Sequence, residues 1–183
     1  MKLLKQGKRE MVLIRTEQES DYEQVYKVVS EAFKNASHSD GNEPDLVNKL
    51  RKSKAFIPEL SLVAIKNGKI DGHILFTKAY VNEHTVLALA PLSVLPACQR
   101  QGVGLALIEA GHQIAKNLGY EFSVVLGHPE YYPKAGYVPA GLYGIKPPFP
   151  VADENFMALC LNGKDLRLDG IIRYDDAFGI PQE

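Results

Sequence analysis

The stretch VLALAPLSVLPACQRQGVGLALIEAGHQIAKNL, which runs from Val86 to Leu118, decides the fold of this 183-residue chain. Its first ten residues, 86–95, are almost all apolar and have the character of a β-strand. From Gly102 onward the apolar side chains recur every three or four residues, which predicts a helix with one buried face. That face is expected to contain Val103, Leu107, Ala110, Ile114 and Leu118. Two glycines therefore lie where a strand turns into a helix.

The start of this helix has the properties of an anion-binding site. The first backbone N–H groups of a helix have no partner inside it and point back along its axis. Together with the helix dipole they favour a bound anion, most often a phosphate. Gly102 and Gly104 have no Cβ, so a phosphate could approach the backbone closely, and Arg100 adds a fixed positive charge.

The residues around the glycines exclude two common phosphate-binding motifs. A Walker loop needs Gly-Lys-Ser or Gly-Lys-Thr, and the chain contains neither. A Rossmann fingerprint needs a third glycine, and Leu107 takes that place. What remains is Gln99-Arg100-Gln101-Gly102-Val103-Gly104, preceded by Leu92-Ser93-Val94-Leu95-Pro96. A mononucleotide-binding protein built on this turn stays open as an alternative.

The pattern resembles the pyrophosphate loop of the GNAT superfamily of N-acetyltransferases, in which Gln or Arg is followed by two residues, Gly, one residue, and Gly or Ala. A second segment supports the resemblance, because a predicted strand, 122–126, is followed by Tyr131-Tyr132-Pro133-Lys134-Ala135-Gly136-Tyr137. In the family this segment is a short helix with a Tyr four residues before a Gly-aromatic pair, and Tyr132 matches that position. The resemblance covers about residues 11 to 162.

The resemblance implies an α/β fold with a central mixed, mostly antiparallel sheet, a splayed parallel strand pair and flanking helices. It implies transfer of the acetyl group of acetyl-CoA to a primary amine by direct attack in a ternary complex, without a metal. Tyr132 would protonate the leaving thiolate. The backbone of Leu92, Ser93 and Val94 would hold the pantetheine arm. The pyrophosphate would lie over Gln99, Arg100, Gln101, Gly102, Val103, Gly104 and Leu105.

The N-terminal half predicts two helices and a meander of strands. A strand is expected over 11–15. The first helix is expected to bury Val25, Val28, Val29, Ala32 and Phe33. Pro44 is well placed to begin the second helix, which fades before Ile57-Pro58. Strands over 60–66, 70–81 and 86–95 then follow one another. Asn67-Gly68 is a strong hairpin signal.

Two details of the strands carry structural predictions. Ile70, Gly72, Ile74 and Phe76 alternate along one strand, so they are expected to share a face. Pro91 cannot donate to a sheet ladder, so it predicts a bulge or an edge. In the resembled family the corresponding strand bulges and separates from its parallel neighbour. Further strands are expected over 156–161 and around Ile171-Ile172.

The general base and the acceptor are left open by the sequence. Candidate bases are Glu43, Glu83, His84, His128 and Glu130. His128 is close to Tyr132 and has a suitable pKa as a residue type, yet it is equally well explained as a turn residue. In the family the loop from Ser37 to Glu43 borders the acceptor, a small-molecule or peptide amine. Its carboxylates, with Asp45, suit a cationic amine, although acidic residues also favour a helix start.

Composition sets the remaining bounds. Charged residues make up 23% and the net charge is -1, so a nucleic-acid or membrane partner is not expected. Cys98 and Cys160 lack metal-ligand spacing, which fits a reduced cytoplasmic location, and Cys98 is expected to be a bystander. The expected organisation is a flexible leader over 1–10 and a single domain over 11–183, of which 163–183 is a C-terminal extension. A homodimer is common in the family. The alternatives to an acetyl-CoA-dependent N-acetyltransferase are a non-catalytic CoA-binding sensor or scaffold of the same fold and an enzyme of the same fold that uses another acyl-CoA.

Overall fold

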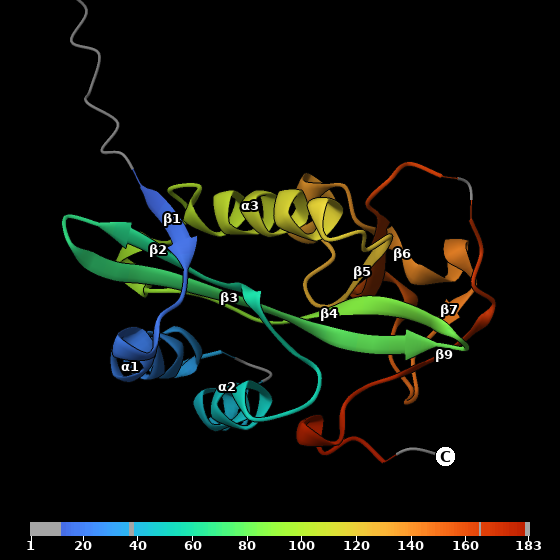
Figure 1. Ribbon diagram of the computed structural model, residues 1–183, viewed down its shortest axis with the longest axis horizontal. Helices are drawn as coiled ribbons and strands as arrows, with labels where there is room; N and C mark the ends of the chain where they lie inside the picture. Colours follow the sequence, from blue (N-terminus) through green and yellow to red (C-terminus); the bar gives the residue numbers. More distant parts are fainter. Residues whose placement is uncertain (1–11, 37–38, 165, 182–183) are drawn as a thin grey trace, which may run out of the picture.

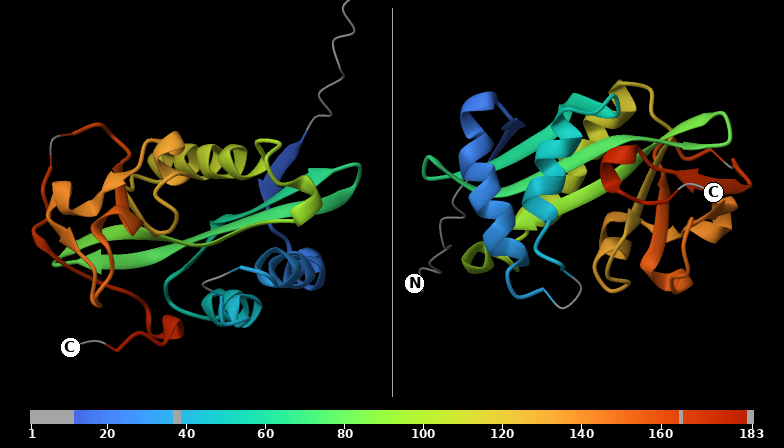
Figure 2. Two further views of the ribbon diagram at one scale, coloured as in Figure 1. Left: turned by 180° about the vertical axis from the view of Figure 1, so that it is seen from behind. Right: turned by 90° about the horizontal axis from the view of Figure 1, so that it is seen from below.

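The computed structural model describes residues 12–36, 39–164 and 166–181. The expected leader over 1–10, the start of the first strand at Met11, and the first two residues of the acceptor loop, Ser37 and His38, lie outside the described residues. A mixed sheet crosses the molecule, with α1 (Tyr22–Phe33) and α2 (Glu43–Arg51) on one face and α3 (Val103–Asn117) on the other (Figures 1 and 2). The fold is therefore layered, with helices on both sides of the sheet.

The described strands are β1 (Leu13–Thr16), β2 (Phe56–Lys66), β3 (Lys69–Val81), β4 (His84–Val94), β5 (Phe122–Leu126), β6 (Val138–Pro139), β7 (Ile145–Lys146), β8 (Phe156–Cys160) and β9 (Gly170–Arg173). Short 3-10 helices are η1 (Glu19–Asp21), η2 (Pro96–Cys98), η3 (Tyr132–Ala135), η4 (Ala140–Tyr143), η5 (Asp153–Asn155) and η6 (Asp176–Phe178). These bounds confirm the meander, the strand after α3, and the terminal strand around Ile171-Ile172.

The sheet order is β1-β2-β3-β4-β5-β8-β6, with β9 beside β3 and β7. Its neighbours are antiparallel except for two parallel pairs, β4–β5 and β7–β9. The chain passes from β4 through α3 to β5, as expected for a parallel crossover. The predicted mixed, mostly antiparallel sheet with one parallel crossover pair is confirmed.

The β2–β3 hairpin corrects one sequence prediction. Asn67 and Gly68 both have positive φ, 51° and 76°, as a two-residue turn of this kind requires. A register shift follows, because Ala64 pairs with Gly72 but Ile65 pairs with Ile70. The shift turns Ile70 to the face of α1 and α2, while Ile74 and Phe76 face α3. The prediction that Ile70 shares their face is wrong, because a bulge breaks the two-residue alternation.

Pro91 lies in the bulge that the sequence predicts. Ile74 of β3 pairs with Leu92 and Phe76 pairs with Leu89, so two residues of β4 stand opposite one residue of β3. The start of β2 differs from expectation, because the strand begins at Phe56 and contains Pro58. A second register shift, between Phe56 and Ser61, lets the strand accept a residue without an N–H.

The buried face of α3 is rotated from the predicted one. Val103 and Leu107 are buried as expected, but the rest of the buried face is Gly104, Ile108, Gly111, His112 and Ala115. Ala110 and Ile114 are only partly buried, and Leu118 is the exposed cap that follows the helix. The helix has apolar side chains on more than one stripe, so periodicity alone does not choose between them.

The C-terminal segment is built into the same sheet. Tyr80 and Val81 of β3 pair with Arg173 and Ile172 of β9, and η6 packs against α2. Figure 2 shows this segment on the side of the sheet that carries α1 and α2. Its apolar side chains, which include Leu168 and Ile172, join a cluster with β5 and β8 that is separate from the cluster under α3.

Candidate active site

The helix start on which the anion prediction rests is formed as expected. Gly102 precedes α3 with φ of 86°, a conformation that glycine adopts without strain. No side chain in the described part of the chain caps the helix, so its first N–H groups remain available to a ligand. Among the residues that the structure describes, no atom beyond the chain neighbours lies within 4 Å of the position that a Cβ at Gly102 would take. The backbone here is open to a phosphate.

The loop before α3 is braced by its own glutamines. The side chain of Gln99 donates to the carbonyl oxygen of Val94 at 3.1 Å, and that of Gln101 donates to Ala97 at 2.9 Å. Arg100 stands between them, exposed and without an ion pair to any described residue. The glutamines therefore shape the loop, and the charge of Arg100 is left for a ligand.

β4 separates from β5 beyond its first contacts. The two strands pair only at Leu87 with Ser123 and at Ala88 with Val124. From there to Val94, β4 pairs with β3 alone among the described residues. One edge of β4, including the predicted residues 92–94, is thus left without a neighbouring strand, which is the opening that the sequence predicts.

A tyrosine that the sequence left without a role joins α3 to β4. A Cβ at Gly104 would collide with the hydroxyl oxygen of Tyr131, and it would lie 3.6 Å from Cδ2 of Leu92. The start of α3, the free edge of β4 and the segment after β5 therefore meet at one place. The two adjacent tyrosines, Tyr131 and Tyr132, are plain in the sequence, but nothing in the sequence indicates which of them contacts α3.

Tyr132, the predicted proton donor, lies deeper. Its ring packs edge-on against Tyr131 and Tyr137, with centroid distances of 5.3 and 5.6 Å, and a Cβ at Gly127 would collide with it. Burial, followed by the influence of Tyr131, raises the pKa of the Tyr132 phenol well above its ordinary value. The phenol is therefore protonated at neutral pH. The short helix expected after β5 is present as η3.

The candidate bases are dispersed. Glu83 and His84 lie at the β3–β4 turn, roughly 30 Å of strand away from Ser93 at about 3.3 Å per residue. His128 begins the turn that leads to Tyr132, because its carbonyl oxygen accepts from the N–H groups of Tyr131 and Tyr132. Glu43 begins α2 on the face opposite α3, and its Oε2 is buried without a hydrogen-bond partner among the described residues.

A buried ionic cluster, which the sequence analysis missed, lies on the face of the sheet opposite α3. The carboxylate of Glu17 accepts hydrogen bonds from Arg51 and, at 2.6 Å, from Ser61, and Nε2 of His73 lies 3.6 Å from it. Burial opposes ionisation of Glu17, but His73, Arg51 and Ser61 together outweigh burial and lower its pKa to about 2. The residues of this ionic cluster are up to 56 positions apart in the chain, so no local sequence pattern reveals the cluster.

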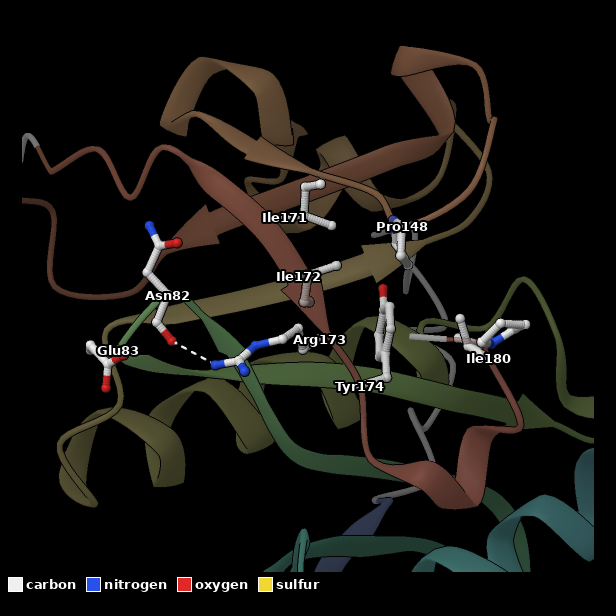
Figure 3. A pocket seen from close by; sticks show the side chains of 9 residues that line it. Asn82, Glu83, Pro148, Ile171, Ile172, Arg173, Tyr174 and Ile180 are labelled. Carbon is white, nitrogen blue, oxygen red and sulfur yellow. Dashed lines mark hydrogen bonds between the residues drawn. The ribbon is translucent and has the colours of Figure 1, made fainter. Parts of the chain in front are cut away.

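A pocket of about 470 Å³ lies away from the start of α3 (Figure 3). Its walls come from the β3–β4 turn, β9 and the C-terminal segment, and Arg173 in it donates to the carbonyl oxygen of Asn82 at 3.0 Å. None of the predicted CoA-binding residues lines it. The pocket and the start of α3 are thus distinct places.

Other candidate chemistries find little support among the described residues. Burial, and then the neighbouring Asp71, raise the pKa of the Cys98 thiol, which disfavours the reactive thiolate. The described part of the chain contains no group of three or more His, Cys, Asp or Glu side chains that could hold a metal ion. No described helix is both long and apolar enough to cross a bilayer.

Comparison with known proteins identifies the family. Residues 22–136 match the model of the acetyltransferase (GNAT) family, a span that contains the α3 start and both tyrosines. This chain belongs to the GNAT family. The "Uncharacterized N-acetyltransferase YjhQ" of Escherichia coli K12 is 36% identical to it over 165 residues, 86% of this chain and 88% of the relative.

Solved GNAT structures have the same fold. A GNAT family acetyltransferase from Brucella melitensis in complex with acetyl-CoA superposes with a TM-score of 0.76 and 30% identity, over 92% of this chain and 99% of that one. The GNAT protein YhbS of Escherichia coli in complex with CoA has a TM-score of 0.80 and 24% identity, over 93% of each chain. The GNAT assignment therefore rests on sequence and on fold together.

Proposed function

We propose that this GNAT protein is an N-acetyltransferase that moves the acetyl group of acetyl-CoA to a primary amine. The observation that carries the proposal is the uncapped, open start of α3 beside the unpaired edge of β4. Such a helix start suits a pyrophosphate, and a free strand edge suits the amides of a pantetheine arm. The acetyl-CoA and CoA complexes of the two solved relatives support the same ligand.

The residues predicted for CoA fit this ligand. Gly102, whose Cβ side is open, would let the pyrophosphate approach the amides of Val103, Gly104 and Leu105, with Arg100 as a counter-charge. The Cβ side of Gly104 is filled by Tyr131, so that glycine would contribute its N–H. The backbone of 92–94 would hold the pantetheine arm, because that edge of β4 has no strand partner among the described residues. The side chain of Ser93 is buried and points to the face of the sheet opposite that of Leu92 and Val94, so only the backbone of Ser93 would take part.

The chemistry proposed is direct attack in a ternary complex. The thioester supplies an activated acetyl group, so a C–N bond forms while the C–S bond breaks. Tyr132 donates its phenolic proton to the departing thiolate, a role that its raised pKa permits by keeping the phenol protonated. The amine proton passes to solvent or to a base that remains unassigned.

The acceptor is proposed to be a cationic amine that enters from the face of α1 and α2. Four buried side-chain atoms lack a hydrogen-bond partner among the described residues: Oε2 of Glu43, Nδ1 of His73, Oγ1 of Thr77 and Oγ of Ser93. Of these, Oε2 of Glu43 and Oγ1 of Thr77 are proposed to contact the acceptor. Thr77 pairs with Ala88, the last residue of β4 that pairs with β5, and it shares a face with Leu75, which packs under α1. Unpartnered buried polar atoms are rare in folded proteins and mark places where a ligand can bond.

The proposal is tested by an acceptor screen. Acetyl-CoA is incubated with amines of different charge, released thiol is detected, and the acetylated product is identified by mass spectrometry. Thiol release that depends on an amine supports the transferase. Tight CoA binding without transfer to any amine would favour the sensor or scaffold alternative, and turnover with a longer acyl-CoA only would favour a different acyl donor.

A further inference from the structure

Tyr131 and Tyr132 are neighbours in sequence but occupy different environments. Their rings are nearly perpendicular, with an angle of 88° between the planes. Tyr132 is packed against Gly127 and Tyr137, whereas the hydroxyl of Tyr131 lies against Gly104 at the start of α3. The two phenols therefore lie in different places and are expected to have different roles.

We propose that Tyr131 is a positioning residue for the cosubstrate, whose phenol donates a hydrogen bond to an oxygen of the phosphopantetheine arm of CoA. The inference rests on the proposed function. Residues 99–105 would hold the pyrophosphate and 92–94 the pantetheine, so the arm must pass between Gly104 and Leu92. The hydroxyl of Tyr131 lies at that junction, because a Cβ on Gly104 would meet both the hydroxyl and Leu92.

The surroundings of Tyr131 support a binding role. Its side chain is only partly buried, and its hydroxyl has no hydrogen-bond partner among the described residues. Burial raises the pKa of its phenol, so it remains a hydrogen-bond donor at neutral pH. A packing role alone would need the ring and not the hydroxyl, and phenylalanine would then serve equally well.

The test compares three tyrosine-to-phenylalanine variants of the full chain. Tyr131→Phe should bind CoA about five- to tenfold more weakly in calorimetry, the value of one hydrogen bond to a charged or polar group. Its KM for acetyl-CoA should rise by the same factor while kcat changes by less than about twofold, the signature of lost uniform binding. Tyr132→Phe should instead lower kcat and leave the KM for acetyl-CoA almost unchanged. Tyr143→Phe, a partly buried tyrosine in the other apolar cluster, is the matched control.

A second variant keeps the inference testable if Tyr131→Phe is unstable. Gly104→Ala keeps the chemical group of Tyr131 but forces its hydroxyl to move away from the start of α3, since the colliding atom is the end of a side chain. It should weaken CoA binding in the wild-type background and much less when combined with Tyr131→Phe. Equal CoA affinity of Tyr131→Phe and wild type, or additive effects of the two changes, would overturn the inference. If the wild type binds no CoA, the proposed function itself fails, and this inference fails with it.

Discussion

Nε2 of His112 lies 2.9 Å from the hydroxyl oxygen of Tyr137, inside the protein. The same hydroxyl lies 2.7 Å from Oγ of Ser123, so α3, β5 and the segment after η3 meet at one phenol. Tyr137 is also the ring against which Tyr132 packs. Burial, and to a smaller extent Lys116, lower the pKa of His112 to about 4.

Stability should therefore fall on mild acidification. The unfolded chain binds a proton at His112 below its ordinary pKa of 6.5, and the folded protein does so only near 4, so the free energy of unfolding decreases as the pH falls between these values. The loss between pH 6.5 and 5 should be on the order of 1–2 kcal/mol. Urea unfolding of wild type and His112→Gln measures it, with the exposed His84→Gln as control. An unchanged pH slope in His112→Gln would contradict the assignment. The contribution of Glu17, whose pKa is 4.5 in the unfolded chain and about 2 in the folded protein, is lost below pH 5 and so lies outside the measured range from pH 6.5 to 5.

Removing Arg51 should be costly, because it would leave the buried carboxylate of Glu17 without its guanidinium. We expect Arg51→Met to lower the free energy of unfolding by about 3–5 kcal/mol, the usual result of breaking a buried ion pair from one side. The control is Lys27→Met, which breaks the exposed pair with Glu23 and should leave the free energy of unfolding almost unchanged. Similar losses in the two variants would show that the Glu17 cluster does not stabilise the fold.

Glu43→Gln tests the acceptor. If its carboxylate binds an ammonium group, the variant should raise the acceptor KM by about tenfold, the value of a charged hydrogen bond, and leave the KM for acetyl-CoA unchanged. Asp45→Asn is the matched control, since Asp45 is in the same helical turn but already accepts a hydrogen bond from Tyr26. Equal effects on both Michaelis constants, or a loss of stability alone, would assign Glu43 to the helix start instead.

Tyr132→Phe tests the proton donor. The variant keeps the ring that packs against Tyr137 and removes only the hydroxyl, so it should fold and bind acetyl-CoA almost normally. Turnover should fall roughly a hundredfold to ten-thousandfold if chemistry limits the rate, the usual range for general acid catalysis. Turnover close to that of wild type, with the chemical step shown to be limiting, would leave Tyr132 a core residue.

The local patterns predicted most of the fold. The glycines around residue 103, the Asn67-Gly68 turn and Pro91 each dictate backbone geometry within a few residues, and each prediction held. The errors arise where tertiary contacts decide. Ile70 changed faces because of a bulge, and the buried stripe of α3 was chosen by the sheet beneath it.

The site was less predictable for the same reason. The loop and the β4 edge follow from sequence-local motifs, whereas the Glu17 cluster and the contact of Tyr131 with Gly104 join segments far apart in the chain. The general base has no local signature, and the structure disperses its candidates: Glu83 and His84 lie at the β3–β4 turn, His128 in the turn before Tyr132, and Glu43 at the start of α2.

The central claim is that CoA binds at the start of α3, and calorimetric titration of CoA tests it most directly. Wild type should bind. Arg100→Asn, which suits the positive φ of 61° at that exposed position, should bind about three- to tenfold more weakly than the control Arg167→Asn. Folded Gly104→Asp should show no binding, because its carboxylate would repel the phosphates and its side chain would displace Tyr131, which lies against Gly104. Wild-type affinity in folded Gly104→Asp, or no CoA binding by wild type, would contradict the account.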